Sequence, residues 1–352
     1  MDKISSERIT LLRFPLMIMV LVAHASGETV NLNGVVYGYE GKMTYLTWLS
    51  SCIVGQYICR LAVPVFLIIS AYFLFKHAPW SPAEFVTLLR KKARSLALPY
   101  FVWNIIAYGS ILLLYAFRGQ PLVSADDSVA RMQILNGVGL GVHLAAFQLW
   151  FLRDLLILIL FSPLIYLAIK HIPKIYFAVL FAVWAFKLWP LPVPCDRAIV
   201  HFSIGAWLAI NKKNLFQFDA VAPALLLPYL LYLYKAEMLP KALKTPFYCI
   251  GILMGVILLL WATKLLYKSP SWIKGPLLYF SGASFFIFLV HEPLILSYSR
   301  ALAYTLMDPM TPTEALVVMF SVPCILTVAL ALVHKGLCVT APRLEAFLTG
   351  GR

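Results

Sequence analysis

Two ionisable side chains, Arg13 and His24, lie in a long apolar stretch near the N-terminus and are the first candidates for chemistry. They are eleven residues apart in the sequence. On an α-helix this spacing corresponds to ~16 Å along the axis and roughly 20° of rotation, so both side chains share one stripe. Ionisable groups inside membrane spans are costly and are functional candidates by default. A lone histidine in a span is often a packing residue, but its pairing with Arg13 favours a functional role.

The histidine suits one class of reaction in particular. Transfer of an acyl group from a thioester to a hydroxyl needs a base for the hydroxyl proton and donors for the developing oxyanion. An imidazole titrates near neutrality and can act as that base. The sequence shows no convincing nucleophile elbow and no Cys/His arrangement for an acyl-enzyme, so direct transfer is the simpler mechanism. The six cysteines form no metal-ligand spacing, and no metal site is expected.

The composition predicts an all-α polytopic membrane protein that positions these residues. Of 352 residues, 62% are hydrophobic and 12% are charged, whereas soluble domains are about half apolar and a quarter charged. The net charge of +14 could suggest nucleic acid, but the basic residues lie mainly between apolar stretches. That pattern is typical of membrane topology, so nucleic-acid binding is not expected.

About ten apolar stretches are long enough to be considered as membrane spans. They cover residues 9–27, 45–75, 97–117, 146–169, 175–190, 198–211, 219–234, 246–267, 276–299 and 315–334. If the N-terminus is inside, 17 Lys and Arg residues lie in inner segments and 9 in outer segments. This bias predicts that both termini are cytoplasmic. We expect one transmembrane domain over residues 1–352, without a fused soluble domain.

This topology places polar residues at two depths of the membrane. Arg13, Ser70 and the basic run that ends at Arg94 lie near the inner leaflet. The outer level holds His24, Trp150, Arg153, Asp154, His291 and Glu292. Arg153 and Asp154 are adjacent in sequence and do not face each other on a helix, so each is expected to pair with another helix. Structural ion pairing is the alternative to a functional role for these two.

Residues 81–95 form a separate amphipathic element, with Ser81 as the expected N-cap and Pro82 at the first helical position. Its basic end contains Lys91, Lys92 and Arg94. One interpretation is an interfacial anchor held by anionic lipid. The other is a basic entrance for a phosphate-bearing cosubstrate, and the two interpretations are compatible.

Five sequence elements, taken in order, resemble the membrane acyltransferase 3 family. They are the Arg13-x10-His24 pair, VPVFLIISAYFLF at 63–75, KKARSLALPYFVWN at 91–104, LWFLRDLLIL at 149–158 and SFFIFLVHEPLI at 284–295. Ala71 stands where that family usually has glycine, and Lys92 where it often has arginine. The resemblance extends from Arg13 to about Pro293.

The resemblance implies ten helices, acyl-CoA as donor, His24 as the essential base and Arg13 as its required companion. Members of the family acylate surface glycans and lipids. We therefore expect an acetyl-CoA-dependent glycan O-acetyltransferase of the bacterial cytoplasmic membrane, with no permanently bound cofactor. Lys91, Lys92, Arg94 and Ser70 would bind the donor. Trp150, Arg153, Asp154, His291 and Glu292 would form the acceptor site or support it.

Two other classes of protein remain open at this stage. A transporter or flippase of a glycolipid would also place charges within the membrane, although such proteins often show repeated halves, which this sequence lacks. A structural or sensory membrane protein would not need Arg13 and His24 on one stripe.

Overall fold

A computed structural model describes residues 2–27, 29–32, 35–41, 44–122, 124, 126–307 and 311–351. Most of these residues are helical and few are in strands, which confirms the all-α class. The described strands are β1 (Thr29–Leu32) and β2 (Val35–Gly38), which pair antiparallel in one hairpin with Thr29 opposite Gly38.

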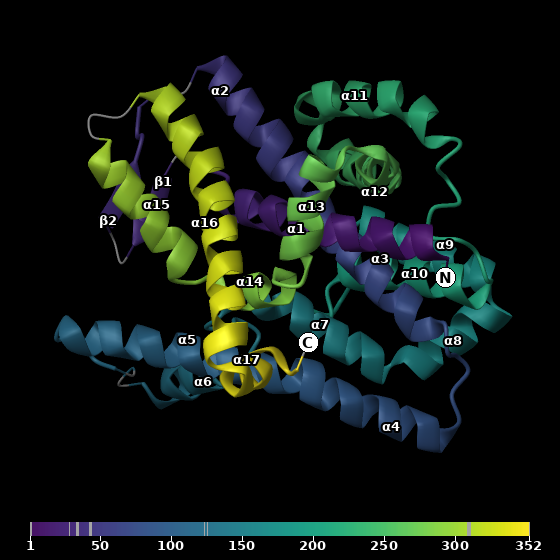
Figure 1. The fold of residues 1–352 in the computed structure, drawn as a ribbon, viewed down its shortest axis with the longest axis horizontal. Helices are drawn as coiled ribbons and strands as arrows, with labels where there is room; N and C mark the ends of the chain where they lie inside the picture. Colours follow the sequence, from purple (N-terminus) through teal and green to yellow (C-terminus); the bar gives the residue numbers. More distant parts are fainter. Residues whose placement is uncertain are drawn as a thin grey trace. The chain divides into compact units, whose positions relative to one another are not determined.

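The helices follow one another along the chain with short connections (Figure 1). They are α1 (Lys3–Ala25), α2 (Tyr45–Ser50), α3 (Ala62–Phe75), α4 (Pro82–Lys92), α5 (Leu98–Phe117), α6 (Asp127–Gly137), α7 (Trp150–Leu160), α8 (Ser162–His171), α9 (Pro173–Ala185), α10 (Asp196–Ile210), α11 (Leu226–Lys235), α12 (Lys241–Lys268), α13 (Ser271–Ser281), α14 (Ser284–Val290), α15 (Ile295–Leu306), α16 (Pro312–Thr340) and α17 (Pro342–Thr349). Single turns of π- or 3-10 type adjoin several of them: η1 (Ser51–Ile58), η2 (Cys59–Leu61), η3 (Ala93–Ala97), η4 (Phe147–Leu149), η5 (Ala222–Leu225) and η6 (Ala236–Met238).

Several of these helices are long and apolar enough to cross a bilayer, as expected of a multi-pass membrane protein. Five continuous helices in the described chain meet that test, at Lys3–Ala25, Thr47–Phe75, Pro82–Phe117, Ala242–Lys268 and Pro312–Thr340. Two bent pairs raise the number to seven if each pair is one span: α7 with α8, bent by 64°, and α13 with α14, bent by 58°.

Each of the ten predicted stretches contains helix, but not all of them are single long helices. α9 has 13 residues, about 20 Å of helix, whereas the hydrocarbon core is about 30 Å thick. The predicted span 276–299 is divided among α13, α14 and α15, with Gly282 at the first break and Pro293 at the second. Glycine weakens a helix and proline cannot donate its backbone hydrogen bond. Ten crossings and cytoplasmic termini stay predictions.

The chain divides into two compact units, and neither is a continuous segment. The first comprises residues 1–26, 45–86 and 157–281, and the second comprises residues 27–44, 87–156 and 282–352. Each unit is therefore built from three pieces of the chain. That the whole chain acts as one domain stays a prediction.

In the first unit, α3 packs closely against α10, and α1 packs against α12 and α13. Gly205 of α10 allows the close approach, because a Cβ atom there would lie 2.1 Å from the Ile68 carbonyl oxygen of α3. Ala71, which replaces the glycine usual in the resembled family, is fully buried. The glycine that permits tight packing of these helices therefore lies on α10.

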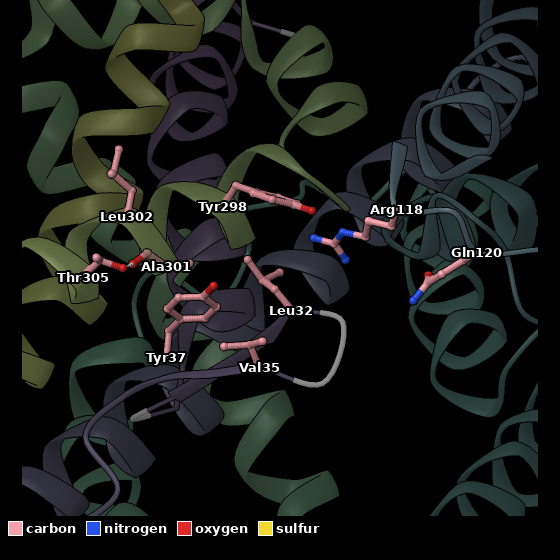
Figure 2. A pocket seen from close by; sticks show the side chains of 9 residues that line it. All are labelled: Leu32, Val35, Tyr37, Arg118, Gln120, Tyr298, Ala301, Leu302 and Thr305. Atoms are coloured by element: carbon pink, nitrogen blue, oxygen red, sulfur yellow. Dashed lines mark hydrogen bonds between the residues drawn. The ribbon is translucent and has the colours of Figure 1, made fainter. Parts of the chain in front are cut away.

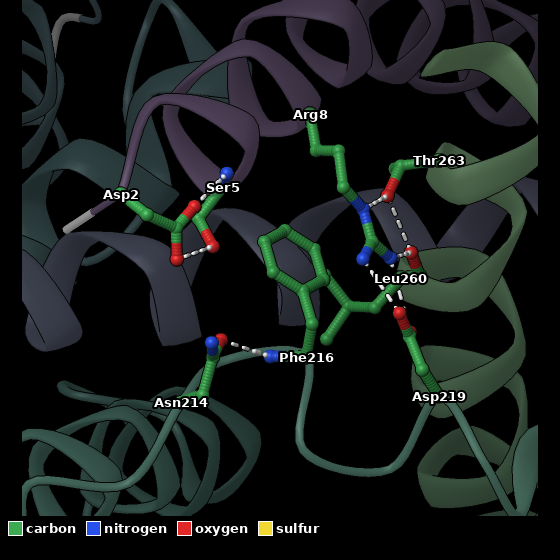
Figure 3. Close-up of polar contacts among 8 residues, drawn as sticks. All are labelled: Asp2, Ser5, Arg8, Asn214, Phe216, Asp219, Leu260 and Thr263. Carbon is green, nitrogen blue, oxygen red and sulfur yellow. Dashed lines mark hydrogen bonds and ion pairs between the residues drawn. The ribbon is translucent and has the colours of Figure 1, made fainter. Parts of the chain in front are cut away.

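A buried polar cluster holds the beginning of α1 to distant parts of the first unit. Arg8 donates hydrogen bonds to Thr263 Oγ1 at 2.8 Å and to the Leu260 carbonyl at 2.9 Å, and it pairs with Asp219. The Phe216 ring lies 3.7 Å from the guanidinium carbon (Figure 3). Arg8 is one of the 17 cations of the predicted inner segments, but the structure buries it, with 6% of its surface exposed.

In the second unit, the hairpin β1–β2 lies beside α15 (Figure 1). Arg300 of α15, 5% exposed, donates hydrogen bonds to the carbonyls of Gly27 at 2.7 Å and Thr29 at 3.2 Å. α16 begins with a capping box, in which Thr311 and Glu314 exchange hydrogen bonds between side chain and backbone. These contacts fix the hairpin and the start of α16 without using any candidate catalytic residue.

The amphipathic element predicted at 81–95 begins as expected but does not end there. Pro82 is the first helical residue, and Ser81 and Glu84 form reciprocal hydrogen bonds at the N-terminus. The helix then continues to Phe117 through the wider turn η3. Pro99 lies just beyond η3 and lacks a backbone donor, and such wider turns allow a helix to pass a missing hydrogen bond. The prediction of a separate element is therefore wrong.

Candidate active site

Arg13 and His24 both belong to α1, which is helical without interruption from Lys3 to Ala25 and contains Pro15. Arg13 is exposed and His24 is half-buried in the last turn. Because the helix is continuous, their separation of ~16 Å along the axis follows from helix geometry. Two groups this far apart cannot touch the same reacting atom, so they serve different parts of a substrate or different steps.

The wall beside His24 is built by η1 and η2, which pack on the last turns of α1. Gly55 allows this contact, since a Cβ atom there would lie 2.4 Å from Ser26 Cβ. Gln56 Nε2 donates to Ser26 Oγ at 2.5 Å, and Ser26 Oγ donates to the Ala23 carbonyl at 2.7 Å. The end of α1 is therefore held in place on both sides of His24.

Arg60 is a charged residue of η2, which packs against α1. It is exposed, and it lines a cavity of about 310 Å³ in the first unit. The contact between α1 and η2 brings the segment that carries Arg60 against the helix that carries His24.

Ser70 lies on α3 of the first unit and is half-buried. The other donor candidates, Lys91, Lys92 and Arg94, belong to the second unit. Lys91 and Arg94 are exposed and Lys92 is half-buried. Exposure of the run fits both a phosphate entrance and a lipid anchor.

The C-terminal helix α17 is packed against this basic run within the second unit. Gly350, at φ 72°, approaches it so closely that a Cβ atom would lie 2.7 Å from Ser95 Cα and 2.8 Å from the Arg94 carbonyl. Trp103 Nε1 donates to the Leu348 carbonyl at 3.0 Å. The backbone at Arg94 is thus fixed, while its side chain remains exposed.

Arg153 and Asp154 contact each other, which corrects the expectation that they would not. Arg153 Nε lies 3.4 Å from Asp154 Oδ1, and Nη1 donates to the carbonyls of Gly141 at 3.2 Å and Val142 at 2.8 Å. Helix geometry separates adjacent Cβ atoms, but the long arginine side chain folds back over the carboxylate. Asp154 is completely buried, so a neighbouring cation stabilises its charge. These contacts give both residues a structural role.

His291 and Glu292 follow α14 and are both buried. His291 Nδ1 lies 3.0 Å from the carbonyls of Ile287 and Phe288, so this nitrogen carries a proton and donates to them. Ser297 Oγ donates to Glu292 Oε2 at 3.0 Å. The backbone of this segment is held by Gln148 Nε2, which donates to the carbonyls of Glu292 at 2.5 Å and Leu289 at 3.1 Å.

Gln148 was missed by the sequence analysis. It is 2% exposed and immediately precedes Leu149 and Trp150. A single amide in an apolar stretch was the available signal, but only the tertiary structure shows that it joins the start of α7 to the end of α14. Trp150 itself is half-buried at the first position of α7.

A second cavity of about 460 Å³ lies in the second unit, between the hairpin, the end of α5 and α15. Figure 2 shows Arg118 and Gln120 on one side and Tyr37 and Thr305 on the other. No candidate catalytic residue lines it, so it is not assigned to the reaction.

The sequence model of the acyltransferase domain matches residues 6–334 of the chain. The protein belongs to this acyltransferase family. Family membership confirms the resemblance drawn from the five sequence elements and favours acyl transfer over transport. All the candidate site residues lie within the matched region, whereas α17 lies beyond it.

A curated relative extends this comparison over the full length of the acyltransferase. The succinoglycan biosynthesis protein ExoH of Rhizobium meliloti (strain 1021) is 27% identical in an alignment that covers 100% of this chain and 94% of that protein. No solved structure matches the chain at a significant level.

Proposed function

We propose that this protein is an O-acyltransferase that moves an acyl group, with acetyl as the first candidate, from cytoplasmic acyl-CoA to a hydroxyl of a surface or lipid-linked glycan. The observation that carries the proposal is that the acyltransferase family region includes α1 with Arg13 and His24 on one continuous helix. The relative named for succinoglycan biosynthesis supports a polysaccharide acceptor. The proposed location is the bacterial cytoplasmic membrane.

In the proposed reaction, His24 is the general base. The acceptor hydroxyl attacks the thioester carbonyl carbon while the imidazole takes the hydroxyl proton. The new C–O ester bond forms, the C–S bond breaks, and CoA leaves as a thiolate. The imidazolium then returns the proton to the thiolate, so that free CoA thiol and neutral His24 are regenerated. No acyl-enzyme and no resident metal or cofactor are needed for this balance.

The positive charge of the basic run suits it to bind the acyl donor. The phosphates of acyl-CoA are anionic, and Lys91, Lys92 and Arg94 offer cationic donors on the second unit. Arg13 on α1 and Ser70 on α3 belong to the first unit, and their contact with the donor stays a prediction. Trp150, Arg153, Asp154, His291 and Glu292 are proposed as residues that support the acceptor, with Asp154 and Glu292 acting through their buried contacts.

The test is a transfer assay with the full-length protein in lipid nanodiscs. Acyl-CoA labelled in the acyl group is supplied with a bacterial polysaccharide or oligosaccharide, and free CoA thiol and labelled glycan are measured together. The proposal predicts equal amounts of both products. Binding of acyl-CoA without release of thiol for any acyl chain or acceptor contradicts it. Release of thiol without labelled glycan shows an acyl-CoA hydrolase and contradicts the acceptor assignment.

A further inference from the structure

The cavity beside Arg60 is large enough for a ligand and has no role in the proposed reaction. Its volume of about 310 Å³ is at the small end of the range for ligand pockets, roughly 300–1,000 Å³. Its lining comes from η1, η2, α10, the start of α12 and the ends of α9 and α11. All of these belong to the first unit.

A chain of contacts leads from the end of α1 to this cavity. Gln56 binds Ser26, two residues beyond His24, and Tyr57 and Arg60 follow on the same segment and line the cavity. The Tyr57 ring lies 6.3 Å from the Tyr248 ring, and both Arg60 and Tyr248 line the cavity. The segment of η1 and η2 therefore contacts the end of α1 and also lines the cavity.

The position of α12 agrees with this placement. Thr263, near the C-terminal end of α12, binds Arg8 at the beginning of α1. Lys244 and Tyr248, near the N-terminal end of α12, line the same cavity as Arg60. The cavity is thus associated with the end of α1 that carries His24, and the Arg8 cluster with the other end.

One side of the cavity is aromatic. Tyr232 stacks edge-on with Tyr57, with ring centroids 5.7 Å apart, and lies 5.4 Å from Phe247. Gly251 makes room for the Tyr232 ring, because a Cβ atom there would lie 2.1 Å from it. The Tyr232 side chain is 2% exposed, and its hydroxyl has no hydrogen-bond partner among the described residues. A buried hydroxyl without a partner is costly, and a ligand hydroxyl in the cavity would satisfy it.

The other groups of the cavity carry an excess of positive charge. Four cations line it, and one carboxylate, Asp196, accepts a hydrogen bond from the Arg197 backbone at 2.7 Å. The cations are Arg60, Lys187, Arg197 and Lys244.

A second acid, Glu237, lies behind the lining. It is bound to Tyr57, and its carboxylate is 3.0 Å from Lys244 Nζ. Four cations against these two acids leave a net charge of +2, which favours an anionic ligand.

We propose that this cavity binds an anionic sugar of the acceptor glycan and presents its hydroxyl to His24. The aromatic rings would pack against the apolar C–H face of the sugar. The Tyr232 hydroxyl and the Asp196 carboxylate would bind sugar hydroxyls, and Arg60, Arg197 and Lys187 would bind the negative substituent. The catalytic part of this inference rests on the proposed function, but binding of the sugar does not.

Two kinds of acceptor carry suitable anions, a carboxylate on a uronic acid and a phosphate on a lipid-linked sugar. The shared chemistry is an anionic group beside sugar hydroxyls. A uronate oligosaccharide, its carboxyl-reduced neutral counterpart and a lipid-linked sugar diphosphate are therefore compared as acceptors. The wild-type protein is expected to prefer at least one of the anionic acceptors over the neutral one by about tenfold in kcat/KM, which is the value of one charge-assisted contact.

The double variant Arg197→Gln/Lys187→Gln tests the cations. We expect the KM for the preferred anionic acceptor to rise about tenfold, with little change in kcat, in KM for the neutral acceptor or in the Kd for acyl-CoA. Arg197→Lys should recover part of the loss. The matched control is Lys212→Gln/Lys213→Gln, which removes two cations beyond the opposite end of α10. Thermal melting of each variant verifies that it is folded.

Three outcomes overturn the inference. In the first, the wild type uses the neutral acceptor as well as both anionic ones. In the second, the double variant weakens acyl-CoA binding instead of acceptor binding, which would assign the cavity to the donor. In the third, the double variant changes the KM for the acceptor only when the nanodisc contains phosphatidylglycerol, which would assign the cavity to a lipid headgroup.

A binding measurement separates this inference from the proposed function. The His24→Ala protein is titrated with the uronate oligosaccharide, the lipid-linked sugar diphosphate and the neutral oligosaccharide, with fluorescence of the cavity residue Trp184 as the signal. Stronger binding of an anionic sugar supports the cavity even if no acyl transfer is found with any protein. Equal affinity for all three sugars overturns the cavity assignment even if transfer is found.

Discussion

Arg8 and Asp219 form a two-bond ion pair across 211 residues of sequence, with Nη1 2.5 Å from Oδ2 and Nη2 3.0 Å from Oδ1. The Arg8 side chain is 7% exposed and that of Asp219 is 20% exposed. The pair joins α1 to the segment before η5, and the same guanidinium reaches α12. The helix that carries His24 is therefore anchored at its other end by a charge that no candidate mechanism uses.

Removal of the carboxylate should destabilise the first unit. Asp219→Ala leaves the buried Arg8 guanidinium without its partner, which costs on the order of 3 kcal/mol. We expect a lower midpoint of thermal unfolding in nanodiscs. Glu7→Gln is the control, because Glu7 and Lys274 are 4.0 Å apart and more than a quarter exposed, and such pairs contribute about 0–1 kcal/mol. Equal midpoints for Asp219→Ala and wild type would show that Arg8 is not held by this pair.

His24→Ala should abolish transfer while acyl-CoA binding is retained. Loss of a general base lowers the rate by about 10²–10⁴-fold. The wild-type rate should also fall at acidic pH as the imidazole becomes protonated, and this decline should be missing from the residual activity of the variant. The assay measures kcat from pH 5 to 8, together with the Kd for acyl-CoA.

His291→Ala is the matched control for that experiment, since its Nδ1 is already bound to backbone carbonyls. The His291→Ala variant should show a clear fall in the midpoint of thermal unfolding but only a small change in kcat. If His291→Ala abolishes transfer in folded protein while His24→Ala stays near the wild-type rate, the base has been wrongly assigned. Arg13→Ala should differ from both by weakening the donor interaction, because Arg13 lies ~16 Å from His24 along α1.

The basic run should govern donor affinity. Replacement of Lys91, Lys92 and Arg94 by Gln removes charge-assisted contacts worth about 1.5–3 kcal/mol each when well formed. We expect the Kd for acyl-CoA to rise and its dependence on salt to weaken. The control is Lys212→Gln/Lys213→Gln/Lys264→Gln, which removes three cations from other segments that are also predicted to be cytoplasmic. An unchanged Kd in the first variant would leave the run as a lipid anchor.

Topology can be tested by reporter fusions. The charge bias predicts cytoplasmic reporters at positions 85 and 170 and external reporters at 125 and 308, of which the last two lie outside the described residues. An external reporter at position 85 would remove the basic run from the side where acyl-CoA is made. It would also reverse the two depths on which the donor and acceptor assignments depend.

Glu237 should make stability depend on pH in the acidic range. The hydrogen bond from Tyr57, and then the contact with Lys244, lower the pKa of Glu237 below its ordinary value of 4.5. A carboxylate with a lowered pKa stabilises the folded state above that ordinary value, and this contribution is lost as the pH falls through the folded-state pKa. Glu237→Gln should therefore melt lower than wild type at pH 7, and the difference should shrink below about pH 4.5. In a Tyr57→Phe background, the effect of Glu237→Gln at pH 7 should be smaller.

Much of the architecture could be predicted from the sequence. Apolar stretches, charge bias and the Ser81–Pro82 start depend on local composition and on the cost of polar groups in lipid, which act within one segment. The five family elements, Arg13 and His24 among them, are likewise contiguous or nearly so. These features identified the membrane class and the acyltransferase family.

Contacts between distant segments were decided only by the tertiary structure. Burial of Arg8 against Asp219 and the contact of Gln148 with the Glu292 carbonyl cannot be predicted from the sequence, because each depends on the packing of other helices. The cavity beside Arg60 is the clearest case. Its cations and tyrosines are separated by up to 191 residues (Tyr57 to Tyr248), and packing of η1, α10 and α12 brings them into one ligand-sized space.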